Sequence, residues 1–100
     1  MAGFIQVIEV QTSRFDELQA LTDAYREQAA AGNKARRSTV TEDRDRPGTY
    51  LNIVEFDSYE SAMQNSQRPE TAQFAEQLAK LCDAPPTFRN LDVRLVTEMP

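Results

Sequence analysis

The 100-residue sequence contains no histidine, no tryptophan and a single cysteine, Cys82. Histidine is the commonest general base near neutral pH, so its absence removes the Ser-His and Cys-His nucleophile pairs together with most zinc sites. One cysteine cannot form a disulfide within the chain, and neither a P-loop nor a GxGxxG motif is present. These absences predict a protein that holds no haem, flavin, metal or other cofactor.

Basic residues are also few, with 11 Lys and Arg against 16 Asp and Glu and a net charge of −5. The only basic cluster, Arg36 and Arg37, is too short to follow a phosphate backbone, so no nucleic-acid partner is predicted. Long apolar runs are missing, because Gln6 and Glu9 interrupt the first one. Neither a secretory signal nor a membrane span is therefore predicted, and we expect a cytoplasmic protein with no membrane partner.

The composition predicts one compact domain over residues 1–100. Hydrophobic residues make up 40% and charged residues 27%, glycine occurs three times, and no linker, repeat or low-complexity run is present. Cys82 falls at a core spacing within a predicted helix, which leaves two interpretations, an inert buried thiol or a nucleophile.

Two segments, Phe4–Val10 and Tyr50–Phe56, alternate like β-strands but carry apolar residues on both faces. Successive side chains of a strand point to opposite faces, so both segments are predicted to be central strands covered on either side. Lys34–Glu42 and Phe88–Val96 are more polar, and each has the pattern of an edge strand.

Helical segments are predicted between these strands. The first is capped by Ser13 and stopped by Gly32, the second is capped by Ser58, and the third begins at Pro69. The order is β-α-β-β-α-β, with the second helical element in two pieces. This order predicts an α+β ferredoxin-like fold.

The predicted four-stranded antiparallel sheet has the order 4-1-3-2, with the helices on one face. The other face would expose more apolar surface than monomers usually tolerate. We therefore expect a homodimer through the sheet faces, which forms an α+β barrel. In such a dimer, Val54→Asp is expected either to split the pair or to unfold the chain, because it buries an unpaired charge.

The segment that ends the third strand and follows it contains Phe56–Met63, Asn65-Ser66, Pro69-Glu70 and Phe74-Ala75. This motif resembles the antibiotic-biosynthesis-monooxygenase-like branch of the dimeric α+β barrel superfamily. The superfamily includes cofactor-free monooxygenases of aromatic polyketides, haem-degrading enzymes and many proteins of unknown role. Haem-degrading members use a histidine ligand and a tryptophan, both absent here, so haem degradation is not expected. Many members have histidine at the polar positions that Asn65 and Glu70 occupy in this chain.

Asn65 is the candidate catalytic residue, because the resemblance implies that a polar side chain in this helix binds substrate or oxygen. An amide can donate a hydrogen bond to an enolate or peroxide oxygen without itself titrating. The alternative is that Asn65 terminates the short helix. The candidate ligand-pocket residues are aromatic or amide side chains: Tyr25, Tyr50, Asn52 and Tyr59. The three tyrosines can equally be core or interface residues.

Polar residues interrupt both central strands, Gln6 and Glu9 in one, Asn52 and Glu55 in the other. If each pair shares a face, one face carries amides and the other carboxylates, and a carboxylate there can serve as a base. The alternative is that these residues lie near strand ends or pair with arginine. The charged Thr41–Thr49 segment is predicted to be a solvated hairpin turn, with a lid over a pocket as the other interpretation.

Two functional classes remain. The first is a dimer that binds a small apolar or aromatic ligand without a cofactor, or that has a non-catalytic role. The second is a cofactor-independent monooxygenase or isomerase acting on an aromatic polyketide-like substrate. An open pocket between sheet and helices, lined by Tyr25 and Asn65, favours the enzyme, whereas a filled interior favours the non-catalytic role.

Overall fold

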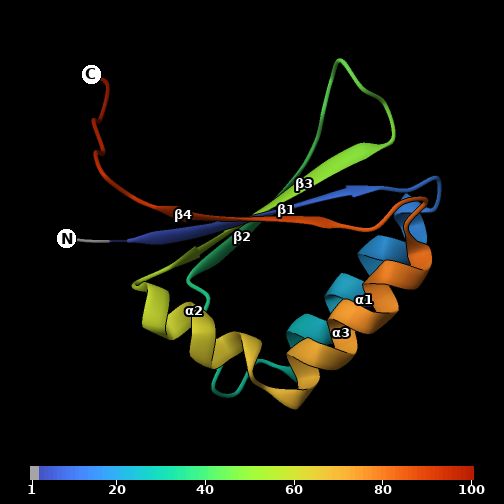
Figure 1. The fold of residues 1–100 in the computed structure, drawn as a ribbon, viewed down its shortest axis with the longest axis horizontal. Helices are drawn as coiled ribbons and strands as arrows, with labels where there is room; N and C mark the ends of the chain where they lie inside the picture. The colour runs from blue at the N-terminus through green and yellow to red at the C-terminus, as the bar shows by residue number, and fades with distance from the viewer. Residues whose placement is uncertain (1–2) are drawn as a thin grey trace.

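The computed structural model describes residues 3–100 and confirms the predicted ferredoxin-like order. One antiparallel sheet contains β1 (Phe4–Gln11), β2 (Arg37–Glu42), β3 (Thr49–Phe56) and β4 (Thr87–Asp92) in the order β2-β3-β1-β4. The helices are α1 (Phe15–Gln28), α2 (Tyr59–Ser66) and α3 (Pro69–Leu81). Figure 1 shows all three on the same side of the sheet. None of the helices in residues 3–100 is long and apolar enough to cross a bilayer.

The register of the central pair decides which side chains face the helices. Gln6 lies opposite Val54 and Val7 opposite Ile53, and directly opposed residues share a face of the sheet. The side that packs on the helices, here called the inner face, therefore carries Phe4, Gln6, Ile8 and Val10 of β1 and Tyr50, Asn52, Val54 and Phe56 of β3. The opposite side, the outer face, carries Ile5, Val7, Glu9, Leu51, Ile53 and Glu55.

The buried core forms two clusters at opposite ends of the central strands. One contains Phe4, Phe56 and Ala62 of α2, and the other contains Val10, Leu18 of α1 and Leu78 of α3. Phe4 and Val10 are six residues apart in β1, which is about 20 Å along a strand. The helices thus pack tightly at both ends of the sheet and leave its middle less filled.

Leu78 is expected to be a strong stability determinant, because its side chain is only 4% exposed between α1, α3 and β1. Leu78→Ala should lower the free energy of unfolding by about 2–5 kcal/mol, through lost burial and the cavity that it leaves. Urea denaturation followed by circular dichroism measures this. Leu95→Ala is the matched control, since Leu95 is 84% exposed, and an equal loss in both variants would contradict the assignment of Leu78 to the core.

The beginning of α1 differs from the prediction that Ser13 caps it. The helix begins at Phe15, and its N-cap position is Arg14, which makes no side-chain cap hydrogen bond. Thr12 has the structural role instead, because its buried hydroxyl accepts from the Arg14 N–H at 3.0 Å and donates to the Leu81 carbonyl at 2.6 Å. The threonine therefore links the start of α1 to the end of α3.

Two other residues that were predicted to begin helices are confirmed. Ser58 caps α2, because its Oγ accepts from the Ser61 N–H at 3.1 Å, and Pro69 is the first residue of α3. Gly48 has a φ of +86° in the turn between β2 and β3, a conformation that glycine adopts without strain. The charged hairpin turn is thus formed as expected.

Both edge strands are shorter than predicted. β2 begins at Arg37 rather than Lys34, and β4 ends at Asp92 rather than Val96. The Val93 N–H still donates to the Gly3 carbonyl at 2.9 Å. Beyond Val93 the chain leaves the sheet, as the red end of the ribbon shows in Figure 1, and Leu95 and Val96 are 84% and 74% exposed.

Candidate functional site

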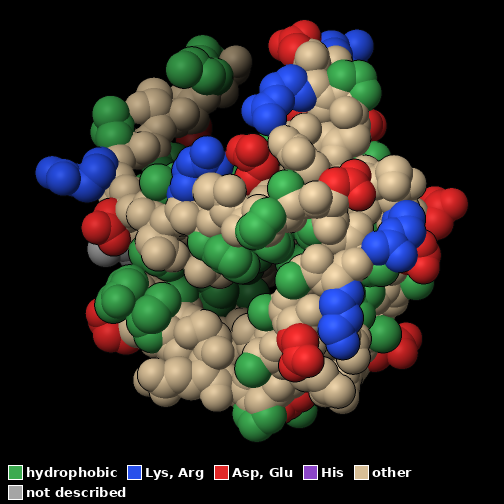
Figure 2. Space-filling view, turned by 45° about the vertical axis from the view of Figure 1, so that its right-hand side comes forward, with side chains coloured by type: hydrophobic (Ala, Val, Ile, Leu, Met, Phe, Trp, Pro, Cys, Tyr) green, Lys and Arg blue, Asp and Glu red, His purple; other side chains and the backbone are tan. Residues whose placement is uncertain are grey.

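A cavity of about 640 Å³ occupies the space between the middle of the inner face and helices α1 and α3. Its floor is formed by the central strands and its wall by side chains of the two helices. The most exposed side chains along it, including Arg26 of α1 and Ser38 of β2, come from α1 and β2, so the cavity opens between these two elements. In Figure 2 hydrophobic side chains surround a hollow near the middle of the molecule, with charged side chains around them.

Two aromatic pairs line the cavity. Phe15 of α1 stacks on Tyr50 of β3 with ring centroids 4.6 Å apart and an interplanar angle of 21°. Tyr25 of α1 and Phe74 of α3 have centroids 4.6 Å apart, and the Tyr25 hydroxyl shares a 2.8 Å hydrogen bond with Thr71. Flat aromatic surfaces of this kind favour a flat, apolar ligand.

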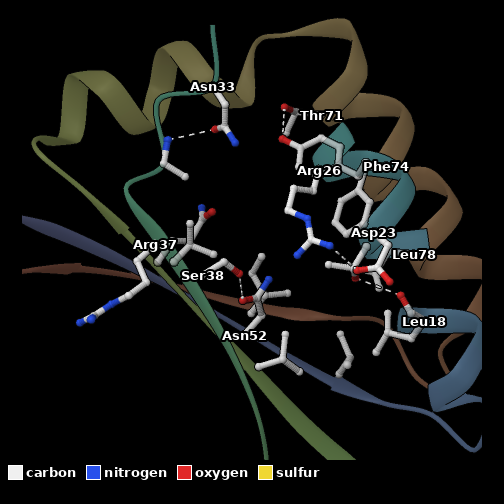
Figure 3. A pocket seen from close by; sticks show the side chains of 18 of the residues that line it. Leu18, Asp23, Arg26, Asn33, Arg37, Ser38, Asn52, Thr71, Phe74 and Leu78 are labelled. Atoms are coloured by element: carbon white, nitrogen blue, oxygen red, sulfur yellow. Dashed lines mark hydrogen bonds and ion pairs between the residues drawn. The ribbon is translucent and has the colours of Figure 1, made fainter. Parts of the chain in front are cut away.

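The floor between the core clusters is polar. Asn52 of β3 and Gln6 of β1 project from the inner face into the cavity, and both are half-buried. Ser38 donates to Asn52 Oδ1 at 2.6 Å, as Figure 3 shows, and Gln6 Nε2 donates to Asn90 Oδ1 at 3.2 Å. The cavity thus combines aromatic walls with an amide-bearing floor.

Asn65 lies in the last turn of α2, only 7% exposed, and lines the same cavity. Its Oδ1 accepts a hydrogen bond from the Lys34 N–H at 3.2 Å. The side chain therefore fixes the segment that leads into β2, rather than terminating its own helix. With Oδ1 engaged in this way, the amide N–H groups of Asn65 remain to interact with a ligand.

The opening of the cavity is charged and solvent-exposed. Arg26 pairs with Asp23 at 2.9 Å on the surface of α1, and both side chains are more than half exposed. Figure 3 shows this pair beside Phe74. Within residues 3–100 no three cysteine or acidic side chains come together as a metal-ligand group.

Two titratable groups near the cavity have perturbed acidity. Burial, together with the carboxylates of Glu42 and Asp16, raises the pKa of Tyr50, so its phenol stays protonated near neutral pH and can donate but not act as a base. Burial and the nearby Asp83 raise the pKa of the Cys82 thiol. A thiol that stays protonated is a weak nucleophile, which favours the inert interpretation of Cys82.

Tyr59 does not lie where the sequence predicted it. Its ring packs edge-on against Phe4 with centroids 5.5 Å apart, it is 51% exposed, and it is not among the residues that line the cavity. The reason is its position in the first turn of α2, beside the core cluster at one end of the sheet. Tyr25, Tyr50, Asn52 and Asn65, in contrast, all contribute to the cavity.

The carboxylates of the central strands share the outer face, away from the cavity. Glu55 accepts a 2.6 Å hydrogen bond from Arg37, and Glu9 pairs with Arg89 at 3.2 Å and Arg46 at 3.9 Å. The predicted pairing of these carboxylates with arginine is therefore confirmed. Because both carboxylates lie on the outer face, neither can act as a base for a ligand in the cavity.

Arg68 ties the helical wall together. Its guanidinium donates to the carbonyls of Ala29 and Ala31 after α1, at 3.2 and 2.7 Å, and to Glu70 in α3 at 2.8 Å. The Arg68 side chain is only 19% exposed. Sequence reasoning did not identify this residue, because nothing in the local pattern shows that a loop 39 residues away supplies its acceptors.

No protein-family model matches the sequence, and no curated protein matches it. Solved structures do resemble it. A monooxygenase of Streptomyces coelicolor in complex with nanaomycin D has a TM-score of 0.83 and 17% identity, with 99% of this chain and 94% of that chain covered. A conserved protein of Methanosarcina mazei has a TM-score of 0.79 and 14% identity, and the match covers 91% of this chain and 92% of that protein. A protein described as an antibiotic biosynthesis monooxygenase has a TM-score of 0.70 and 13% identity, and the match covers 95% of this chain and 100% of that protein. At these identities the likeness shows a shared fold, the one that the sequence motif predicted.

Proposed function

We propose that this chain binds a flat aromatic molecule of two or three fused rings in the cavity between sheet and helices, without a cofactor. The observation that carries the proposal is a cavity of about 640 Å³ lined by two aromatic pairs, within the range of about 300–1,000 Å³ of small-molecule sites. Aromatic walls provide dispersion and stacking, while the amide floor provides direction.

Binding of 1-naphthol tests this proposal. We expect saturable binding of one molecule per chain in the micromolar range, typical of a fragment-sized ligand in an apolar site, measured by calorimetry and by NMR shifts at Tyr25 and Asn65. Val40→Trp should abolish it, because Val40 of β2 lines the cavity and is 43% exposed. Phe88→Trp is the matched control, since Phe88 is 50% exposed on the other edge strand and does not line the cavity. Unchanged binding in Val40→Trp would place the ligand elsewhere.

A second candidate function is cofactor-independent oxygenation of the bound ligand. Asn65 and Tyr25 line an open cavity, which is the arrangement that favours an enzyme over a filled scaffold. The Streptomyces coelicolor monooxygenase of similar fold was solved in complex with the ligand nanaomycin D. In this candidate function the substrate supplies the electrons. An anthrone loses a proton, its carbanion reacts with dioxygen, and the products are the anthraquinone and water, with Asn65 donating to the oxyanion that develops.

We further propose that two copies pair through their outer faces. None of the helices in residues 3–100 covers this face in Figure 1. Apolar side chains occupy its middle, and ion pairs flank them at either end, Glu9 with Arg89 and Glu55 with Arg37. The apolar residues of the patch are Ile5, Val7, Leu51, Ile53 and Leu91. A self-complementary apolar centre with a charged rim suits a two-fold interface.

A further inference from the structure

Two amides on the cavity floor are each held by a neighbour on an edge strand. Ser38 of β2 donates its hydroxyl hydrogen to Asn52 Oδ1 at 2.6 Å, and Asn90 of β4 accepts from Gln6 Nε2 at 3.2 Å. A polar band, defined as Ser38, Asn52, Gln6 and Asn90, therefore crosses all four strands of the inner face. Each central amide is fixed in orientation before any ligand arrives.

The two hydrogen bonds engage opposite ends of the two amides. Asn52 uses its oxygen, so its N–H groups remain to donate. Gln6 uses an N–H group, so its oxygen remains to accept. The floor thus presents one donor and one acceptor, both from side chains that line the cavity.

Both groups come from the central pair of strands on the cavity floor. Gln6 lies opposite Val54, and Asn52 lies opposite Ile8, so the two amides are diagonal neighbours on β1 and β3. Diagonal pairs on a sheet are about 7–8 Å apart at their backbones and within reach of long side chains. The two aromatic pairs line the same cavity.

We propose that the polar band selects ligands whose aromatic ring system carries a carbonyl next to an N–H or O–H on one edge. Asn52 donates to the carbonyl, and Gln6 accepts from the N–H or O–H. This inference rests on the proposed binding function and names the chemistry that the same cavity recognises. It makes Gln6 and Asn52 specificity-determining residues, with Ser38 and Asn90 as their positioning residues.

A matched pair of probes tests the inference. 2-Quinolinone has a carbonyl beside an N–H, and coumarin has the same rings and carbonyl with an oxygen in place of that N–H. We expect the wild type to bind 2-quinolinone about tenfold more tightly than coumarin, the value of one well-made hydrogen bond. Isothermal calorimetry measures both dissociation constants.

Variants assign the two groups separately. Gln6→Leu should remove the preference, because only 2-quinolinone donates to Gln6, whereas Asn52→Leu should weaken both probes, because both have the carbonyl. Gln6→Met and Asn52→Asp serve as second variants if a leucine variant does not fold, since Asn52→Asp keeps an acceptor for Ser38 and loses the donor. Gln64→Leu is the control for surface amides, because Gln64 is exposed on α2 and does not line the cavity.

The outcomes separate this inference from the proposed function. Equal affinity of the wild type for the two probes, or a preference that persists in the Gln6 variants, overturns the polar-band inference while 1-naphthol binding still supports the cavity. Failure of all three compounds to bind overturns both. A preference for 2-quinolinone that disappears in Gln6→Leu and stays in Gln64→Leu supports the inference.

Discussion

Replacing Ile53 with aspartate is expected to convert a dimer of this chain into a folded monomer. Ile53 lies in the middle of the outer face, opposite Val7 on one side and Thr39 on the other. In a single chain this position is half-buried, and the helices of residues 3–100 lie on the opposite side of the sheet (Figure 1), so a carboxylate there keeps its water. In a two-fold interface two such carboxylates lose water close together, and we expect the dimer dissociation constant to rise by at least about 10³-fold.

Light scattering after size-exclusion chromatography measures the effect. The wild type should have twice the monomer mass of 11.3 kDa, and Ile53→Asp should have that mass itself. Val54→Asp is the matched control, because Val54 is the next residue on the same strand but faces the helices and packs against the Phe4 cluster. That variant should lose its cooperative thermal melt instead. A monomeric wild type at micromolar concentration, or a dimeric Ile53→Asp variant, would contradict the proposed interface.

The second large effect concerns Asn65 and turnover. If the chain oxygenates anthrones, removing the amide donor should lower the rate by about 10²–10³-fold. Asn65→Asp is the informative variant, because its carboxylate can still accept from the Lys34 N–H but donates nothing when ionised. Asn65→Ala loses both interactions, and its stability should also fall by about 1 kcal/mol.

Oxygen consumption with anthrone and thermal melts of the three proteins distinguish catalysis from structure. A catalytic donor predicts slow turnover in both variants, and both should melt at a lower temperature, Asn65→Ala through loss of the Lys34 contact and Asn65→Asp through burial of a carboxylate. A purely structural Asn65 predicts normal specific activity in Asn65→Asp. Oxygen consumption by the wild type no faster than in buffer would eliminate the oxygenase and leave the binding function.

The fold was predictable because the central strands are apolar on both faces, a pattern that few architectures of this size accommodate. The ends of the edge strands were not predictable, because an edge strand extends only as far as it pairs with its neighbour. β4 ends at Asp92, which pairs with Phe4, the first residue of β1, although Leu95 and Val96 continue the alternation. Ser13 was predicted to cap α1, and the role of Thr12 could not be predicted because it depends on the Leu81 carbonyl, 69 residues away.

The site was predictable in its residue types but not in its partners. Alternation left open whether Gln6 and Asn52 share a face, and the register of the central strands puts them on one face, which lines the cavity. Ser38 carries no signal in the sequence, because its role depends on a diagonal contact across two strands. Tyr59 was wrongly predicted to line the cavity, because the sequence of a helix does not show which end of the sheet that helix covers. The contact of Asn65 with Lys34 likewise depends on tertiary placement.

The hydrogen bonds of Arg68 make one side of the cavity stiff and leave the other compliant. Its guanidinium joins the segment after α1 to α3, and the Tyr25–Thr71 bond joins the two helices again. Moving α1 outward breaks hydrogen bonds to a charged group, each of which contributes about 1.5–3 kcal/mol. β2 pairs with the sheet along one side only, so expansion of the cavity takes place there. For the proposed ligand site, this difference predicts selection by thickness, since a planar molecule would fit beneath α1 and a bulky one would have to displace an edge strand.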